Sequence, residues 1–129
     1  MTSHKIVSLD QIASKSRELR TQGKRVVLCH GTFDLMHTGH IRYLQRAKQE
    51  GDVLLVTVTA DGYVNKGPGR PIFNQQLRAE NLAALECVDL VALNFAVSAV
   101  DALHMIQPDV YAKGRRFPRR QPQNRTMFP

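Results

Sequence analysis

Cysteine is scarce in this sequence, and long apolar runs are missing. The 129 residues include two cysteines, Cys29 and Cys87, which are too few for a disulfide scaffold. No apolar run approaches the roughly 20 residues needed to span a bilayer. Residues 1–9 hold no apolar stretch long enough for a signal peptide. These features argue against a disulfide-rich secreted domain and a membrane protein, and they favour a soluble, reduced, cytoplasmic protein.

The composition is that of one globular domain. Hydrophobic residues make up 43% of the chain and charged residues 22%, which is not the composition of a disordered protein. A chain of this length buries roughly two-thirds of the surface that its unfolded form exposes. It can therefore build a core without disulfides, and we expect a single domain over residues 1–114.

Positive charge is concentrated at the C-terminus. The net charge is +7, yet residues 1–113 carry 13 basic and 11 acidic groups. The other basic residues lie in the last 16 positions, which contain no acid: Arg115, Arg116, Arg119, Arg120 and Arg125. We expect residues 115–129 to form a basic, disordered tail. A nucleic-acid-binding tail is the alternative, which we disfavour because no folded pattern of aromatic and base-reading side chains accompanies it.

Helical and strand patterns alternate along the chain. Ser8 and Gln11 have the spacing of a capping box, and Gly23 ends the helix that follows. The run 53–59 is apolar and β-branched, as in a strand buried on both faces of a parallel sheet. Asn74 is placed to cap a later helix. Further strands are predicted at 25–29, 89–93 and 109–112, and further helices at 41–47 and 98–106.

This alternation predicts βαβ units with right-handed crossovers, and hence a single α/β domain with a parallel sheet flanked by helices. A long loop, residues 61–73, interrupts the alternation and is rich in glycine and proline. Thirteen residues without periodicity in so small a domain indicate a functional loop. We refer to residues 61–73 as the Gly/Pro loop.

Candidate site residues follow the first predicted strand. In open parallel sheets, ligands bind beyond the carboxyl ends of the strands. Residues 30–40, here named the signature turn, lead from that strand into a helix whose N-terminus suits a phosphate. Gly31 lets the backbone approach a ligand closely. His37 and His40, with Gly39 between them, can share one face of the first turn. There they can donate to phosphate oxygens and stabilise charge in a transition state.

Metal binding is a competing interpretation of this segment, because five possible ligands are close in sequence: His30, His37, His40, Cys29 and Asp34. Zinc sites usually show tighter patterns, such as paired cysteines or histidines four apart on a helix. We therefore favour phosphate binding over a metal held by these side chains.

The segment Gly31-Thr32-Phe33-Asp34-Leu35-Met36-His37-Thr38-Gly39-His40 resembles the G-[TC]-F-D-x-x-H-x-G-H signature of the cytidylyltransferase-like nucleotidyltransferases. The resemblance covers residues 24 to about 114 and implies a Rossmann-like fold. It implies that a nucleoside triphosphate binds at Gly31, Thr32, Phe33, His37, Gly39 and His40, and that the two histidines stabilise the transition state. A phosphate oxygen of a second substrate would attack the α-phosphorus, and pyrophosphate would leave without a covalent enzyme intermediate.

Basic side chains elsewhere fit that reaction, since attack of one anion on another needs concentrated positive charge and in-line alignment. Lys66 in the Gly/Pro loop is expected to close over the phosphates and to act in catalysis. Arg70 and Arg78 are expected to hold the phosphate of the second substrate by bidentate contacts. Asp34 and Lys113 are assigned to the same substrate. Mg²⁺ is expected with the nucleoside triphosphate, although no ligand set for it can be read from the sequence.

Further segments are similar to the adenylyltransferase domain of bacterial ADP-heptose synthesis: Gly69-Arg70-Pro71-Ile72, Leu77-Arg78-Ala79-Glu80 and Pro108-Asp109-Val110-Tyr111-Ala112-Lys113-Gly114. This similarity implies transfer of AMP from ATP to a heptose-type sugar 1-phosphate. The alternative is transfer of CMP to glycerol 3-phosphate or a similar polyol or amino-alcohol phosphate. The glycerol-3-phosphate cytidylyltransferases share the signature but usually carry arginine at the position of Glu86.

One family feature has no counterpart in this sequence. Members normally continue into a further strand and a Ser/Thr-rich turn of the I-S-[ST]-[ST] type, which helps to bind the triphosphate. Here Gly114 is followed by the basic segment 115–129. A nucleotide-binding relative with little turnover is therefore a further alternative. The resemblance also makes a homodimer an expectation, whereas a membrane and nucleic acid are not expected as partners.

Overall fold

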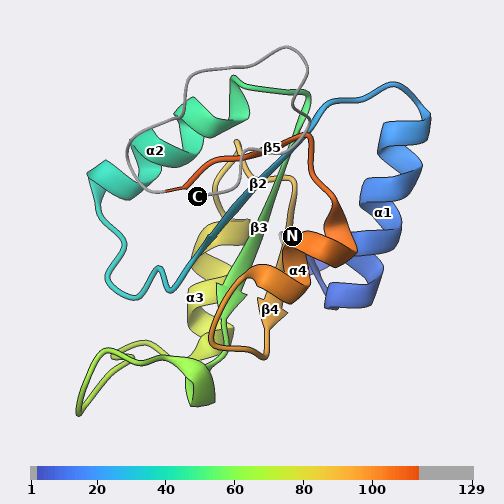
Figure 1. Ribbon diagram of the computed structural model, residues 1–129. Helices are drawn as coiled ribbons and strands as arrows, with labels where there is room; N and C mark the ends of the chain where they lie inside the picture. The colour runs from blue at the N-terminus through green and yellow to red at the C-terminus, as the bar shows by residue number, and fades with distance from the viewer. Residues whose placement is uncertain (1–2, 114–129) are drawn as a thin grey trace.

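The computed structural model describes residues 3–113, which form a parallel sheet with helices on both faces (Figure 1). The predicted α/β class is confirmed. The strands lie in the order β1-β4-β3-β2-β5. Their bounds are β1 Ile6–Val7, β2 Val26–Gly31, β3 Val53–Thr59, β4 Leu90–Asn94 and β5 Val110–Tyr111. The helices are α1 Leu9–Thr21, α2 Thr38–Lys48, α3 Gln75–Ala83 and α4 Val100–Ile106, with 3-10 turns at Ser3–Lys5 and Asp61–Tyr63.

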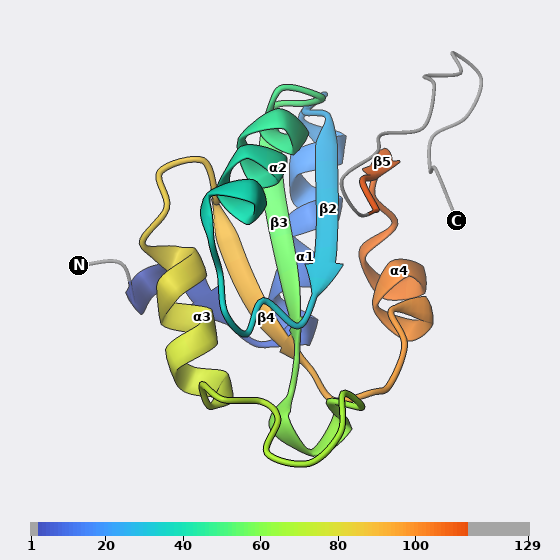
Figure 2. The same ribbon diagram turned by 90° about the vertical axis from the view of Figure 1, so that its left-hand side faces the viewer.

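Alternate side chains of β2 supply two cores, one on each face of the sheet. Val27 and Cys29 pack on the face covered by α2 and α3. Val26 and Leu28 pack on the opposite face, against α1 and α4. Figure 2 shows α1 on the other side of the strands from α2. Because both faces are covered, the strands read as continuous apolar runs rather than as an alternation of apolar and polar residues.

Two helices begin at the predicted caps. Ser8 Oγ accepts a hydrogen bond from the Gln11 N–H at 3.1 Å, and Gln11 Oε1 accepts one from the Ser8 N–H at 2.9 Å. Asn74 Oδ1 accepts a hydrogen bond from the Leu77 N–H at 2.9 Å. The predicted capping box and the predicted cap of α3 are both confirmed.

The strand bounds differ in places from the prediction. Strand β3 matches the predicted range, whereas β2 continues to Gly31 and α2 already begins at Thr38. The sequence does not predict β1, whose residues Ile6 and Val7 pair in parallel with β4. Two residues are too few to show any period, so this strand is visible only through its partner.

The order of the strands creates a crevice beside β2. From β2 the chain moves through β3 to β4 and then returns by α4 to add β5 on the other side of β2. Parallel sheets bind ligands at such a reversal, outside the carboxyl ends of the strands. The signature turn leaves β2 at this end, and Figure 1 shows the Gly/Pro loop at the same end of the sheet. The fold therefore brings the two predicted segments together.

Two sequence expectations concern other parts of the chain. Between residues 3 and 113 the structure has no helix long and apolar enough to cross a membrane. The predicted basic tail, residues 115–129, lies outside the described residues.

Candidate active site

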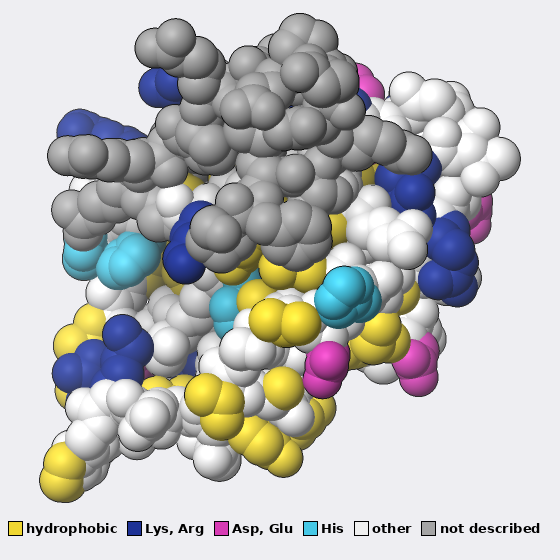
Figure 3. Space-filling model, viewed as in Figure 1, with side chains coloured by type: hydrophobic (Ala, Val, Ile, Leu, Met, Phe, Trp, Pro, Cys, Tyr) yellow, Lys and Arg dark blue, Asp and Glu magenta, His cyan; other side chains and the backbone are white. Residues whose placement is uncertain are grey.

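A cavity of about 390 Å³ opens at the carboxyl end of β2. In Figure 3, histidine side chains and lysine or arginine side chains border a hollow on this side of the molecule. The structure brings most of the predicted site residues into the lining of the cavity: Gly31, Thr32, Phe33, Asp34, His37, Gly39, His40, Lys66 and Arg70.

His37 and His40 cap α2 with their own imidazole rings. Nδ1 of His37 accepts a hydrogen bond from the Gly39 N–H at 3.0 Å, and Nδ1 of His40 accepts one from the His37 N–H at 3.2 Å. A ring nitrogen that accepts a hydrogen bond carries no proton, so each neutral ring carries its proton on Nε2. The cap thus fixes the tautomer of both rings, whose centroids are 4.2 Å apart. Their Nε2–H groups and the helix N-terminus all favour an anion.

Gly31 and Phe33 determine the packing inside the signature turn. The backbone of Phe33 is left-handed, with φ at +51°, a conformation that costs a non-glycine residue roughly 1–3 kcal/mol. A β-carbon at position 31 would lie 3.0 Å from the Phe33 ring. That ring also meets the His40 ring edge-on, with centroids 6.0 Å apart. Glycine at position 31 therefore leaves room for Phe33, which packs against one of the two histidines.

Asp34 faces the Gly/Pro loop and is 5% exposed. Its Oδ2 accepts hydrogen bonds from the Ile72 N–H at 2.7 Å and from Arg70 Nε at 3.0 Å. Its Oδ1 accepts one from the Phe73 N–H at 2.8 Å. Burial alone would raise the pKa of Asp34, but the two backbone N–H groups and the Arg70 guanidinium outweigh it and lower that pKa. Asp34, which the sequence assigned to the substrate, is an ionised anchor of the loop in this structure.

Lys66 and Arg70 bring two cations to the cavity from the Gly/Pro loop. The Lys66 side chain is exposed. Arg70 uses Nε for Asp34, and 35% of its side chain is exposed. Its two terminal nitrogens donate to no acceptor within residues 3–113, so they can turn toward an anionic ligand.

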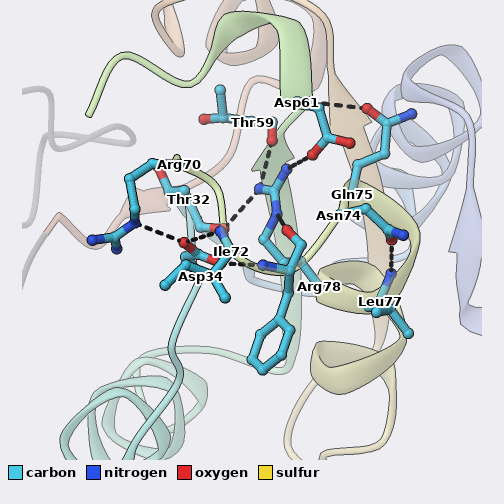
Figure 4. A network of polar contacts seen from close by, with 11 residues as sticks. Thr32, Asp34, Thr59, Asp61, Arg70, Ile72, Asn74, Gln75, Leu77 and Arg78 are labelled. Atoms are coloured by element: carbon cyan, nitrogen blue, oxygen red, sulfur yellow. Dashed lines mark hydrogen bonds and ion pairs between the residues drawn. The ribbon is translucent and has the colours of Figure 1, made fainter. Parts of the chain in front are cut away.

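Arg78 and Lys113, which were also assigned to the second substrate, lie outside the lining of the cavity. Arg78 is fully buried, and its guanidinium donates hydrogen bonds to oxygen atoms of the protein (Figure 4). In this structure its charge is therefore directed at loops rather than at the cavity. Lys113 follows β5 and is exposed.

Three residues of the lining were not among the predicted site residues: His30, Leu35 and Tyr43. His30 Nδ1 lies 2.9 Å from Thr57 Oγ1, and burial lowers the pKa of this histidine. Tyr43 on α2 donates a hydrogen bond to the carbonyl oxygen of Ala112, across the crevice. The position of His30 at the end of a predicted buried strand could have indicated that it lines the cavity. The sequence pattern places Tyr43 in a helix, where it is indistinguishable from a core residue.

The residues of the metal interpretation have separate partners. Cys29 lies in the core under α2, where burial raises the pKa of its thiol to about 12, so it stays protonated near neutral pH. Asp34 holds the Gly/Pro loop, and His37 and His40 hold the start of α2. In the part of the chain that the structure describes, no three His, Cys, Asp or Glu side chains gather as a metal site.

Comparison with protein families identifies the family of this chain. The family model described as cytidylyltransferase-like matches residues 28–124. The chain belongs to the cytidylyltransferase-like family. The predicted family is thus confirmed.

Related proteins agree with this cytidylyltransferase-like assignment. The bifunctional protein HldE of Methylobacillus flagellatus is 43% identical over 112 residues, which cover 85% of this chain and 23% of that protein. HldE of Nitratiruptor sp. is 41% identical over 115 residues, covering 88% of this chain and 25% of that protein. The chain therefore spans about a quarter of the length of these curated relatives.

Two solved structures resemble the structure of this chain. The lipopolysaccharide core biosynthesis protein of Thermoplasma volcanium has a TM-score of 0.64 at 31% identity, over 69% of this chain and 73% of that one. The pantoate-beta-alanine ligase of Francisella tularensis has a TM-score of 0.61 at 19% identity, over 82% of this chain and 54% of that one. The second likeness shows a shared fold alone.

The cytidylyltransferase-like site is built to bind negative charge. Lys66, Arg70 and the two capping imidazoles line one cavity. Within residues 3–113, the single acidic residue of its lining is Asp34, which is already paired with Arg70. Donors that are fixed in place before the reaction stabilise developing charge without reorganising. This arrangement can hold a polyphosphate chain and stabilise extra negative charge on the oxygen atoms of one of its phosphoryl groups.

Proposed function

We propose that this chain transfers AMP from ATP to a heptose-type sugar 1-phosphate and releases pyrophosphate. The observation that carries the proposal is the pair of imidazoles that cap α2, since the cap puts both ring protons on Nε2 in a cavity that Lys66 and Arg70 also line. The choice of acceptor is supported by the segments similar to ADP-heptose synthesis and by the match to HldE proteins.

In the proposed reaction, a phosphate oxygen of the sugar 1-phosphate attacks the α-phosphorus of ATP. One phosphorus–oxygen bond forms, the bond from the α-phosphorus to the bridging β-oxygen breaks, and its electron pair leaves with pyrophosphate. His37 and His40 donate from Nε2 to triphosphate oxygens as charge builds up. Lys66 and Arg70 reduce the repulsion between the two anions. A single fixed donor of this kind contributes about 10²–10³ in rate.

The residues around the cavity do not form a magnesium site. Among the residues that the structure describes, Asp34 is the one acidic residue in the lining, and both of its oxygens already accept hydrogen bonds from the protein. Mg²⁺ commonly keeps several waters and binds mainly through substrate phosphates. We propose that Mg²⁺ enters with the triphosphate, held by its oxygens and by water rather than by this chain.

Pyrophosphate release from a panel of substrates tests the proposal. ATP and CTP are each combined with heptose 1-phosphate, a hexose 1-phosphate, glycerol 3-phosphate and phosphoethanolamine. We expect ATP with heptose 1-phosphate to be fastest, by at least about tenfold, because the fitting acceptor is held in line with the α-phosphorus. A control without acceptor separates transfer from hydrolysis.

Other outcomes would replace the proposal. Fastest release with CTP and glycerol 3-phosphate or phosphoethanolamine would identify a cytidylyltransferase. ATP binding by calorimetry without pyrophosphate release from any acceptor would identify a nucleotide-binding relative with little turnover.

A further inference from the structure

A buried guanidinium joins three segments around the site. Arg78 on α3 has a side chain that is 0% exposed. Its Nη1 donates hydrogen bonds to the carbonyl oxygens of Thr32 at 2.9 Å and Thr59 at 2.7 Å. Its Nε donates to the carbonyl oxygen of Phe73 at 2.9 Å, and its Nη2 to Asp61 Oδ1 at 2.6 Å. These partners lie in the signature turn, at the end of β3, and at both ends of the Gly/Pro loop (Figure 4).

Both ends of the Gly/Pro loop are held from two sides. At its far end, the carbonyl oxygen of Phe73 accepts from Arg78, while the N–H of Phe73 donates to Asp34. At its near end, the Asp61 carboxylate pairs with Arg78, while the Asp61 N–H donates to Gln75 Oε1 at 2.9 Å. The loop is therefore fixed at two points that share one guanidinium.

The middle of the loop has no such attachment. Among the described residues, the hydrogen bonds of residues 64–69 stay inside the loop. The Val64 N–H donates to the carbonyl oxygen of Asp61, and the Arg70 N–H donates to the carbonyl oxygen of Gly67. Gly67 and Gly69 have φ values of +97° and +76°, which glycine adopts without strain. Lys66 lies in this span, so its place at the cavity depends on the two fixed ends.

We propose that Arg78 is a positioning residue, which sets where Lys66 stands over the signature turn without itself contacting substrate. A planar guanidinium can serve several acceptors at fixed angles, which a lysine ammonium cannot do. A fully buried cation also needs its partners, so the loop ends and the Thr32 carbonyl are held as one unit. The consequence of this positioning for turnover rests on the proposed function.

Substituting Arg78 itself would leave three carbonyl oxygens without a donor and put folding at risk. The test therefore changes Asp61→Ala, because 40% of the Asp61 side chain is exposed and the backbone contact to Gln75 remains. Lys48→Ala is the matched control. It removes an ion pair to Asp89 of the same 2.6 Å length at the opposite end of the sheet.

Limited trypsin digestion of the full chain reports on the loop, because Lys66 is itself a cleavage site. We expect cleavage after Lys66 to be about tenfold faster in Asp61→Ala, the factor for one lost charge-assisted hydrogen bond, and unchanged in Lys48→Ala. Asp61→Asn keeps an oxygen acceptor and should restore part of the protection. The proposal is overturned when cleavage after Lys66 is not accelerated, or when cleavage after Lys24 accelerates equally.

A double-mutant cycle tests the link to Lys66 in the pyrophosphate assay. We expect Asp61→Ala to lower kcat about tenfold in the parent chain and to have no effect in the Lys66→Ala background, because Asp61 acts through Lys66. Equal losses in both backgrounds would overturn positioning. The digestion needs neither nucleotide nor acceptor, so it separates failure of this inference from failure of the proposed function.

Discussion

His30 lies at the carboxyl end of β2, with its ring beside two threonine hydroxyls of β3. Its Nδ1 is 2.9 Å from Thr57 Oγ1, and its Nε2 is 3.4 Å from Thr59 Oγ1. Burial lowers the pKa of His30 from 6.5, against a smaller opposite effect of a hydrogen bond with the backbone of Thr57. The unfolded chain therefore binds a proton here at a pH where the folded chain does not. It follows that the free energy of unfolding falls as the pH drops below about 6.5.

Urea unfolding at about pH 7.5 and about pH 5.5 measures this loss. We expect His30→Asn to lose less stability on acidification than the parent chain, because asparagine does not titrate. Asp34 does not interfere, since its pKa is lowered and its contribution is lost only as the pH falls below 3.8. Equal losses in the two chains would contradict the assignment to His30.

Single residues also mark where sequence reasoning fails. The type and spacing of His37 and His40 were enough to place them in one cavity. The same reasoning assigned Arg78 to the binding of the second substrate, because a sequence does not show whether a basic side chain points toward the cavity or into the protein interior. Its position on α3 turns it toward the carbonyl oxygens of Thr32 and Thr59. Only the packing of three segments shows that role.

Two helices of this protein begin with the same reciprocal cap, built from different side chains. At α1 the cap uses the Ser8 hydroxyl and the Gln11 amide. At α2 it uses the imidazoles of His37 and His40. The imidazoles accept backbone hydrogen bonds through Nδ1, and each neutral ring carries its proton on Nε2. The start of α2 therefore places the helix cap and the two imidazoles of the proposed reaction in one pair of residues.

This double role can be separated by substitution. Asparagine is a good N-cap, and glutamine is the usual partner at the third position. We expect the double variant His37→Asn, His40→Gln to keep the free energy of unfolding of the parent chain and to lose about 10²–10³ in kcat or more. The double variant His37→Ala, His40→Ala should lose the same activity and also about 1 kcal/mol of stability.

Urea unfolding and pyrophosphate release measured on the same samples check both parts of that expectation. Near-normal turnover in the asparagine–glutamine variant would show that turnover does not need the imidazole rings.

At the scale of elements, the sequence predicted what is encoded locally. The capping box at Ser8, the cap at Asn74 and the strand Val53–Thr59 are set by neighbouring residues, and all appear in the structure. Strand β1 depends on its pairing with Val91 and Ala92, which lie far away in the chain. The anchoring of the Gly/Pro loop likewise depends on tertiary contacts, so the sequence indicated a functional loop without showing what holds it.

The site depends on strands on both sides of β2, with β3 and β4 on one side and β5 on the other. Strand β5 reaches β2 only after the chain has passed through β3 and β4, and Tyr43 bonds α2 to the residue that follows β5. The cavity lining also includes residues of the Gly/Pro loop, which connects β3 to α3. Local opening of any of these parts would open the site, so a ligand bound there stabilises the folded state as a whole.

Ligand binding should therefore appear in global unfolding. ATP at a concentration 100-fold above its Kd should add about 2.7 kcal/mol to the free energy of unfolding. For a domain of this size the thermal midpoint should rise by roughly 10 °C. In the His37→Asn, His40→Gln variant the same ATP concentration should give a smaller rise, because the cap is kept and the imidazole rings that line the cavity are gone. An equal rise in both chains would place the nucleotide elsewhere, whereas a larger rise with CTP than with ATP would change the expected base.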